Sequence, residues 1–481
     1  MKILCVVALV FAFTTVAYAE TQSIKISGDI TQRAFARGHY QLDTKGGTDD
    51  GFGISTRSDD WDTFLQSTAE IQIDADLTDN VSGVIRLVNQ RVWGENLQVT
   101  TNVTAESGLG KNSADDFSVV ADLAYIELKE FLYSPLTLRI GRQDLWFGRG
   151  MIVGNSLQNP TDSLYAPEYT AINSFDAIRA TFDWDPWTLD VVVAKIQEHQ
   201  LRVADDVTLW GGNLGYVFDS YNAEAEAYYW YQQDRLPQDA YTVSVAAPTG
   251  ISTNPYYGND VHTFGLRGSM DPIEDWTVAL EGAYQGGQYR DPVFFKERER
   301  SAWMLNAFVE CRTFQDDFAW KPVASLEYVF YSGNAVDKDG RYSGWDPMYR
   351  GRFITAIREF QNLYYPTRQD VQDGAVASAN GATNQHQIQG KIVVEPMDDV
   401  TCSAAYTYFW LDKVAGGTVG TAGGIHTSKN IGSEVDLQVT WDYTEDVSFG
   451  LLSAWFVPGD HFESPNDHVA TDVVGTVKLS F

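Results

Sequence analysis

The chain has 481 residues, 65 acidic against 34 basic side chains, and a formal net charge of -31. Phosphate binding requires clustered lysine and arginine, so this acidic balance argues against a nucleic-acid partner. Three cysteines cannot form a disulfide scaffold. With 44% apolar and 13% aromatic residues, the composition also argues against an intrinsically disordered protein. Length alone would allow about three domains of roughly 150 residues each.

The first nineteen residues have the composition of an export signal. Met1 and Lys2 precede an apolar run from Ile3 to Val16, and Ala17-Tyr18-Ala19 has the small-x-small pattern that signal peptidase reads. The run is too short to span a membrane as a helix. We therefore expect residues 1–19 to be cleaved and residues 20–481 to function outside the cytoplasm.

Most of the remaining chain alternates between apolar and polar residues with period two, which predicts strands with one apolar face. In one example, Ile71 and Ile73 alternate with Gln72 and Asp74. The pattern predicts eighteen strands, at 23–40, 62–78, 81–95, 120–132, 136–148, 175–185, 187–199, 208–219, 221–234, 261–272, 275–289, 300–314, 321–334, 384–397, 399–413, 430–444, 446–460 and 467–481.

The predicted connections fall into two groups. Each even-numbered strand is followed by a short turn, whereas odd-numbered strands are mostly followed by long loops, of which 335–383 is the longest. An even strand count with alternating short and long connections is typical of a bacterial outer-membrane barrel. We therefore predict an all-β fold: one antiparallel transmembrane barrel in a Gram-negative-type outer membrane, surrounded by lipid and lipopolysaccharide.

The final strand supports this prediction. Val473, Val477, Leu479 and Phe481 share one face, and the chain ends on the aromatic residue. A terminal phenylalanine on an alternating strand resembles the signal by which the barrel-assembly machinery recognises its substrates. We expect Phe481 to contact that machinery.

Several segments resemble the alginate-export family of outer-membrane barrels. The run Leu138 to Gly148, with the letters LRIGRQDLWFG, is similar to the family's GRQ-type signature, and Phe175-Asp176-Ala177 stands where the family has an FDG-like strand start. Further similar segments are Trp345 to Tyr349 and Ile431 to Leu437. The resemblance runs in order from about residue 120 to the end, and it implies an eighteen-stranded channel that exports an anionic polysaccharide through a basic lumen.

The residues expected on the inward face differ from that basic lumen. Carboxylates outnumber arginines there, which would raise the local concentration of cations. We expect the pore lining and its selectivity to involve Arg142, Gln143, Arg179, Arg267, Glu70, Asp74, Glu224, Glu226, Glu281, Glu434 and Asp436. Arg142 has two interpretations: a guanidinium at the constriction that contacts carboxylates of a passing solute, or an arginine that only neutralises lumen carboxylates.

The loop 335–383 interleaves arginines with aromatic residues, a combination that suits sugars or anionic solutes. A loop of this length is usually functional. We expect it to fold into or over the lumen and to set selectivity, the alternative being a solvated external flap. Its candidate binding residues are Arg341, Arg350, Arg352, Arg358 and Arg368.

No segment has a nucleophile or phosphate-loop motif, so no catalytic residue and no cofactor are expected. Asp337-Lys338-Asp339-Gly340 lacks the remaining positions of a calcium loop, and no metal site is predicted. The leading hypothesis is a passive channel for small hydrophilic solutes or polysaccharide. The alternatives are a secreted or barrel-type carbohydrate-active hydrolase and a non-conducting structural protein of the surface.

Overall fold

The computed structural model describes residues 23–40, 42, 61–93, 119–156, 166–198, 206–235, 259–291, 296–334, 340–360, 383–414, 428–462 and 467–481. The expected signal sequence at 1–19 lies outside these residues, as do Arg368 and Asp337 to Asp339.

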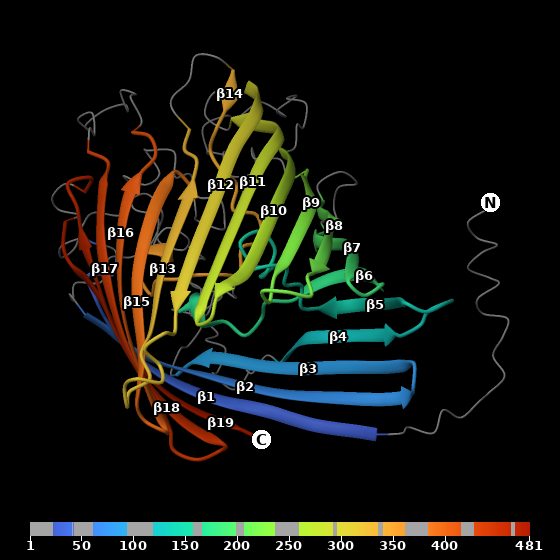
Figure 1. Cartoon of the computed structure of the whole chain (residues 1–481), viewed down its shortest axis with the longest axis horizontal. Coiled ribbons are helices and arrows are strands. Elements are labelled where there is room, and N and C mark those ends of the chain that lie inside the picture. Colours follow the sequence, from blue (N-terminus) through green and yellow to red (C-terminus); the bar gives the residue numbers. More distant parts are fainter. Residues whose placement is uncertain are drawn as a thin grey trace, which may run out of the picture.

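The described chain forms one sheet of nineteen strands, eighteen of which make up a closed antiparallel wall (Figure 1). Consecutive strands pair with each other, except that β13 pairs with β15 because β14 lies to one side. The strands are β1 (Ser23–Gly38), β2 (Trp61–Thr78), β3 (Val81–Val92), β4 (Val120–Leu128), β5 (Leu136–Gln143), β6 (Phe175–Asp183), β7 (Trp187–Gln197), β8 (Val207–Val217), β9 (Glu224–Asp234), β10 (Asn259–Ile273), β11 (Trp276–Asp291), β12 (Lys296–Cys311), β13 (Val323–Tyr331), β14 (Arg341–Tyr342), β15 (Gln385–Met397), β16 (Val400–Leu411), β17 (Asn430–Asp442), β18 (Val447–Pro458) and β19 (Ala470–Ser480). The eighteen predicted strands are therefore confirmed, with ends that shift by a few residues.

The one strand that the sequence did not predict is β14. It is two residues long, belongs to the loop 335–383, and runs parallel to β12 through Glu299↔Arg341 and Arg300↔Tyr342. Two residues are too few to show an alternating pattern, so no sequence signal marks it.

The barrel closes where the first and last strands meet. The register of β1 and β19 runs from Asp29↔Ser480 to Gly38↔Thr471. Beyond it, Gly28 and Phe481 exchange backbone hydrogen bonds of 2.9 and 3.0 Å. The closed ladder pairs both edges of the sheet, which a wall surrounded by hydrocarbon requires.

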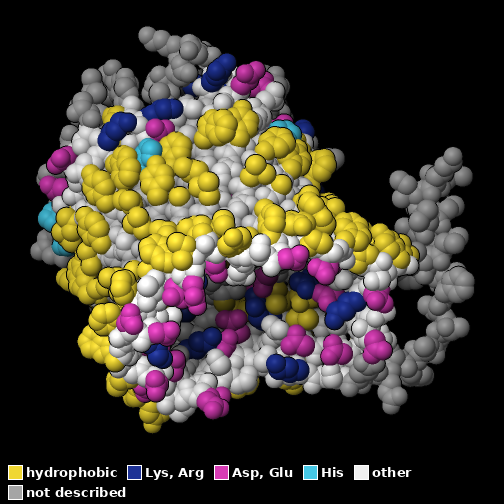
Figure 2. Space-filling view, viewed as in Figure 1, with side chains coloured by type: hydrophobic (Ala, Val, Ile, Leu, Met, Phe, Trp, Pro, Cys, Tyr) yellow, Lys and Arg dark blue, Asp and Glu magenta, His cyan; other side chains and the backbone are white. Residues whose placement is uncertain are grey.

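Side chains alternate across the wall as the period-two pattern predicts. On β10 and β11, Leu266 and Leu280 point outward and are 68% and 58% exposed, whereas the neighbouring Arg267 and Glu281 point inward and are largely buried. The outer wall carries a broad apolar surface, and the hollow beside it is lined by charged side chains of both signs (Figure 2). No helix among the described residues is long and apolar enough to cross a membrane.

The seam between β1 and β19 gives a testable prediction. A Cβ on Gly28 would meet the Glu70 carbonyl oxygen and would lie 2.8 Å from the Phe481 ring, whereas a Cβ on Gly475 of β19 meets nothing within 4 Å. We expect Gly28→Ala to destabilise the closed barrel by about 1–3 kcal/mol, the usual cost of overpacking. Gly475→Ala is the matched control. The measurement is the temperature at which the folded band converts to the unfolded band on a denaturing gel, and equal temperatures for the two variants would contradict the prediction.

Candidate functional site

Two long segments cross the barrel interior, residues 144–156 after β5 and residues 340–360 after β13. A shorter segment at 166–174 packs against the inner wall. Phe147 packs on the inward Trp230 with ring centroids 4.8 Å apart. Arg149 reaches across to Glu327 on β13 at 3.0 Å. From the second segment, Ile357 and Arg358 donate backbone hydrogen bonds to Glu434 on β17. The two segments therefore occupy the lumen and narrow it.

The two segments also bind each other. Tyr349 N donates to Ile152 O at 3.0 Å, and Gly154 N donates to Tyr349 O at 2.8 Å. Gly351 N donates to Gly150 O at 2.9 Å, and a Cβ on Gly154 would lie 3.0 Å from the Gly351 Cα. This close backbone contact makes the inserted loops one unit.

An apolar cluster attaches this unit to one side of the inner wall. Loop residues such as Leu145, Val153 and Trp345 are almost fully buried against inward side chains of β6 to β13. At about 25 cal/mol per Å² of apolar surface, burial on this scale stabilises the loops by many kcal/mol. The cluster comprises Leu145, Phe147, Met151, Ile152, Val153, Phe175, Ala177, Val192, Ala194, Leu209, Tyr228, Trp230, Val261, Ala283, Ala302, Met304, Val329, Tyr331, Trp345, Met348 and Tyr349.

Buried carboxylates hold the second segment in place. Glu434, which is 0% exposed, accepts from Ile357 N at 2.6 Å and from Arg358 N at 2.8 Å. Glu359 of the segment pairs with Arg350 at 3.1 Å and accepts from Gln387 Nε2 at 3.0 Å. The bonds to Glu434 satisfy backbone donors that would otherwise be buried without a partner, and Glu359 likewise accepts from Thr355 N at 3.1 Å.

Single arginines in the lumen lie among several carboxylates. Arg86 bonds Asp122 and lies 3.6 Å from Asp144 and 3.9 Å from Glu70. Arg267 bonds both Glu224, at 2.5 Å, and Glu226. In both groups acid exceeds base, so each retains negative charge. Burial raises the pKa of Asp144 above its usual value, and the nearby Arg86 lowers it in part.

A third group lies between the loop η2 (Pro167–Tyr169) and the wall. Arg37 bonds Glu168 and lies 3.2 Å from Asp472, so it too faces two carboxylates. Burial raises the pKa of the Glu168 carboxyl, and Arg37 opposes that rise.

One place in the lumen has the opposite balance. Arg149 and Arg352 share the single carboxylate of Glu327, at 3.0 and 2.6 Å, and Lys391 lines the same cavity of about 480 Å³. The Nη1 of Arg149 is buried and has no hydrogen-bond partner. The full lining has four cationic side chains, Arg149, Arg267, Arg352 and Lys391, against Glu310 and Glu327, so the balance of this cavity is basic.

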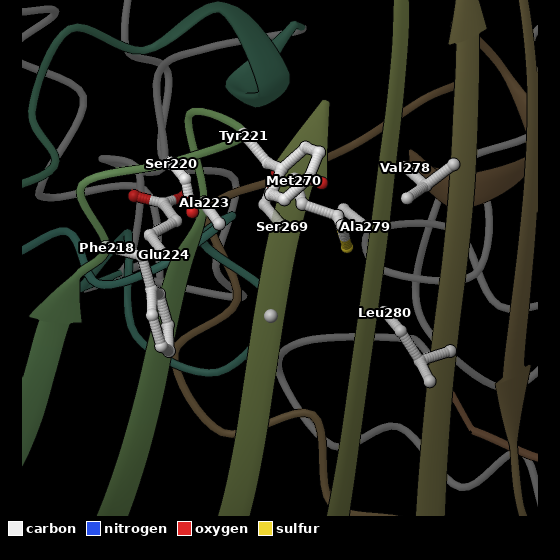
Figure 3. A pocket seen from close by; sticks show the side chains of 11 residues that line it. Phe218, Ser220, Tyr221, Ala223, Glu224, Ser269, Met270, Val278, Ala279 and Leu280 are labelled. Carbon is white, nitrogen blue, oxygen red and sulfur yellow. The ribbon is translucent and has the colours of Figure 1, made fainter. Parts of the chain in front are cut away.

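A second hollow is apolar and lies on the outer wall. It is lined by Phe218, Tyr221, Met270, Val278 and Leu280 around Gly268 (Figure 3). Met270 and Leu280 are exposed and belong to the outward-facing set of their strands. This hollow faces the lipid and is no part of the passage.

Most predicted lining residues do face inward, but several are covered by the loops. Arg179, Arg267, Glu70, Asp74, Glu224 and Glu226 lie on the inner face, and Asp436 lies beside the anchored segment. Gln143, Glu281 and Glu434 are inward but almost fully buried. Glu281 accepts from Tyr228 Oη at 2.8 Å, and Gln143 donates to Ala177 O at 2.9 Å.

The prediction that the Arg142 guanidinium points inward is wrong. The register pairs Ile140 with Ile178 and Arg142 with Asp176, and both isoleucines are exposed on the outer wall. Arg142 therefore points outward and lies 3.5 Å from Asp176. The inward positions of β5 belong to Arg139, Gly141 and Gln143, and a charge at a strand end can face outward at low cost.

The loop arginines divide into three kinds. Arg350 and Arg358 are each 1% exposed and structural: Arg350 bonds Tyr331 Oη, and Arg358 lies over the ring of Phe462. Arg352 lies in the lumen, and Arg341 is exposed on β14. The described part of the loop thus enters the lumen as expected, and its role in selectivity stays a prediction.

Asp144, Trp146 and Arg149 were missed as lumen residues. The alternating pattern predicts a strand that includes the run LWFG, whereas β5 ends at Gln143 and the following residues pack inside the barrel. The glycines at 148, 150 and 154 were a usable signal, because repeated glycine breaks a strand and allows backbones to approach closely.

The sequence profile of the alginate export family matches residues 36–476. This chain belongs to the alginate export family. It is an outer-membrane β-barrel porin and not an enzyme.

Solved structures of low sequence identity share the fold. Acinetobacter baumannii OccAB1 has a TM-score of 0.52 at 12% identity, covering 96% of this chain and 99% of its own. Pseudomonas aeruginosa OpdL has a TM-score of 0.52 at 10% identity, covering 95% of this chain and 99% of its own. Pseudomonas aeruginosa OccK2 (OpdF), solved in complex with glucuronate, has a TM-score of 0.51 at 11% identity, covering 96% of this chain and 99% of its own. No curated protein is similar enough in sequence to count as a match.

The Glu434 anchor gives a testable prediction. Glu434→Gln keeps the shape of the side chain but places an amide nitrogen against one of the two backbone donors. An unsatisfied buried donor costs about 1–3 kcal/mol, so the segment at 357–358 should detach more often. We expect larger current fluctuations in single-channel recordings. The control is Glu395→Gln, which changes an exposed ion pair with Lys321. Equal current fluctuations in the two variants would show that Glu434 does not anchor the segment.

Proposed function

We propose that this porin is a passive channel for small hydrophilic solutes and that its lumen prefers cations. The observation that carries the proposal is the charge balance around Arg86, Arg267 and Arg37, each of which lies among two or three carboxylates. Negative potential in a water-filled pore raises the local concentration of cations and repels anions. The side chains visible in the hollow of Figure 2 include both signs, so the preference is expected to be partial.

A salt gradient tests this proposal. With purified protein in a planar bilayer and a KCl gradient, the reversal potential should lie toward the potassium equilibrium potential. Glu224→Gln should reduce the preference, because Glu224 is 44% exposed in the lumen beside Arg267. The control is Glu445→Gln in the turn between β17 and β18. A reversal potential toward chloride in the unmodified protein would overturn cation preference.

A second candidate is passage of acidic sugars through the basic cavity. Two arginines share Glu327 there, and Lys391 lines the same space. Paired guanidinium groups suit carboxylate recognition. Glucuronate is the ligand of the OccK2 structure, whose fold this chain shares.

Glucuronate block of the potassium current tests this candidate. Arg352→Gln should shorten glucuronate residence about tenfold, which corresponds to roughly 1.4 kcal/mol. Arg341→Gln, on the exposed strand β14, is the matched control. Equal glucuronate residence times in the two variants would show that the cavity does not bind the solute.

We also propose the route by which the protein reaches its membrane. Residues 1–19 would direct export, residues 20–481 would form the barrel, and Phe481 would contact the barrel-assembly machinery. Phe481 is 59% exposed at the end of the wall, which leaves its ring accessible. The apolar outer wall would contact lipid and lipopolysaccharide.

A further inference from the structure

The segment after β5 alternates between buried and exposed side chains as it crosses the lumen. Leu145 is 1% exposed and Phe147 is 9% exposed, because both pack into the apolar cluster. Trp146 is 51% exposed, and the side chain of Asp144 is 53% exposed. In an extended segment, side chains two residues apart lie on one side. Asp144 and Trp146 therefore both face the water in the lumen.

The indole of Trp146 has a fixed position. Its six-membered ring lies against Gly150, Gly154 and Gly351, where Cβ atoms would come within 3.0 Å of the ring. Its Nε1 donates to Gly148 O at 3.1 Å. A large aromatic surface is thus held in place before any solute arrives, which lowers the entropic cost of binding.

The carboxylate of Asp144 shares its neighbouring cations with other carboxylates. Arg139, the second arginine that acts on it, pairs with Glu127 at 2.5 Å. Arg86 directs its Nε at Asp122, at 2.9 Å, and lies farther from Asp144, at 3.6 Å. Glu70 lies 3.9 Å from the same guanidinium. One arginine therefore faces three carboxylates, of which Asp144 is the most exposed.

We infer that Trp146 and Asp144 form a binding site for organic ammonium ions in the lumen. An aromatic face attracts a cation through its quadrupole, most strongly for tryptophan. The adjacent carboxylate supplies the opposite charge, and the excess acid around Arg86 adds to the attraction. The inference deepens the proposed cation preference and rests on it.

Other solutes fit this site less well. The three carboxylates repel an acidic sugar, which belongs in the cavity around Glu327. A neutral sugar gains nothing from the charge of Asp144. Potassium is small and strongly hydrated and makes little use of an indole face. A quaternary ammonium ion or a protonated tertiary amine uses both groups, because its charge is spread over a partly apolar surface.

Choline and its uncharged isostere 3,3-dimethyl-1-butanol separate charge from shape. In single-channel recordings with the full-length mature porin in KCl, choline should cause transient blocks, and the isostere should not. Trp146→Ala should shorten choline residence about tenfold, roughly 1.4 kcal/mol, and Trp146→Phe should shorten it less, since a smaller aromatic face remains. Asp144→Asn should also shorten it.

The control is Trp303→Ala, which removes a tryptophan that is 56% exposed on the outer wall; this variant should keep the choline residence of the unmodified protein. Equal choline residence in Trp146→Ala and Trp303→Ala would overturn the site, and so would equal block by choline and its isostere. The KCl reversal potential is recorded on the same channels. A cation-selective channel without choline block contradicts the ammonium site alone, whereas chloride selectivity contradicts the proposed function.

Discussion

The wall of this protein depends on one constraint: in hydrocarbon, each backbone N–H and C=O must bond within the protein. An open sheet would leave two rows of such groups unpaired. The pairing of β1 with β19 removes both rows, and it brings residues more than four hundred positions apart into register. The absence of a Cβ at Gly28 leaves space for the ring of the terminal Phe481 at this seam. Every other feature of the lumen is built inside this closed wall.

Closure around eighteen strands creates a second problem, because so wide a barrel has more interior than its own side chains can fill. The protein fills part of it with inserted loops, which pack against β6 to β13 and, through Ile357, against β16 to β19. Inward residues of β6 to β13 are apolar where these loops pack, as at Val192, Ala194 and Trp230, and charged where water remains, as at Arg267. The inner face is thus partly a protein core and partly a pore lining.

This division explains what the sequence could and could not predict. Strand positions and closure followed from period-two alternation and from the two classes of connection, because lipid enforces an apolar outer face on every strand. The inner face obeys no such rule. Glu434 and Glu281 have the parity of lining residues but are covered by loops, and nothing local marks them as buried.

Arg142 is the opposite case, because the sequence did contain the signal for its orientation. Its charge suggested an inward position, but parity was readable from Ile140 two residues earlier, and the structure follows parity. For Trp146 and Arg149, the nearby glycines indicate that the strand ends but not where the two side chains lie. Their positions depend on contacts with Glu327 and Gly351, which are distant in sequence. Without coordinates, such contacts cannot be assigned to one side of the lumen.

The charges in the lumen follow from the same arrangement. A guanidinium near an apolar cluster needs carboxylate partners, because a buried charge without one is costly. Arg86, Arg37 and Arg267 each have more carboxylate partners than neutrality requires. Asp144 and Glu224 remain partly in water, whereas both partners of Arg37 are buried. Arg149 and Arg352 have fewer, since both depend on Glu327. A passing solute therefore meets carboxylate-rich groups and, next to the Arg267 group, a cavity in which cationic side chains predominate. Selectivity in this channel is expected to depend on where along the path a solute stops, more than on net charge.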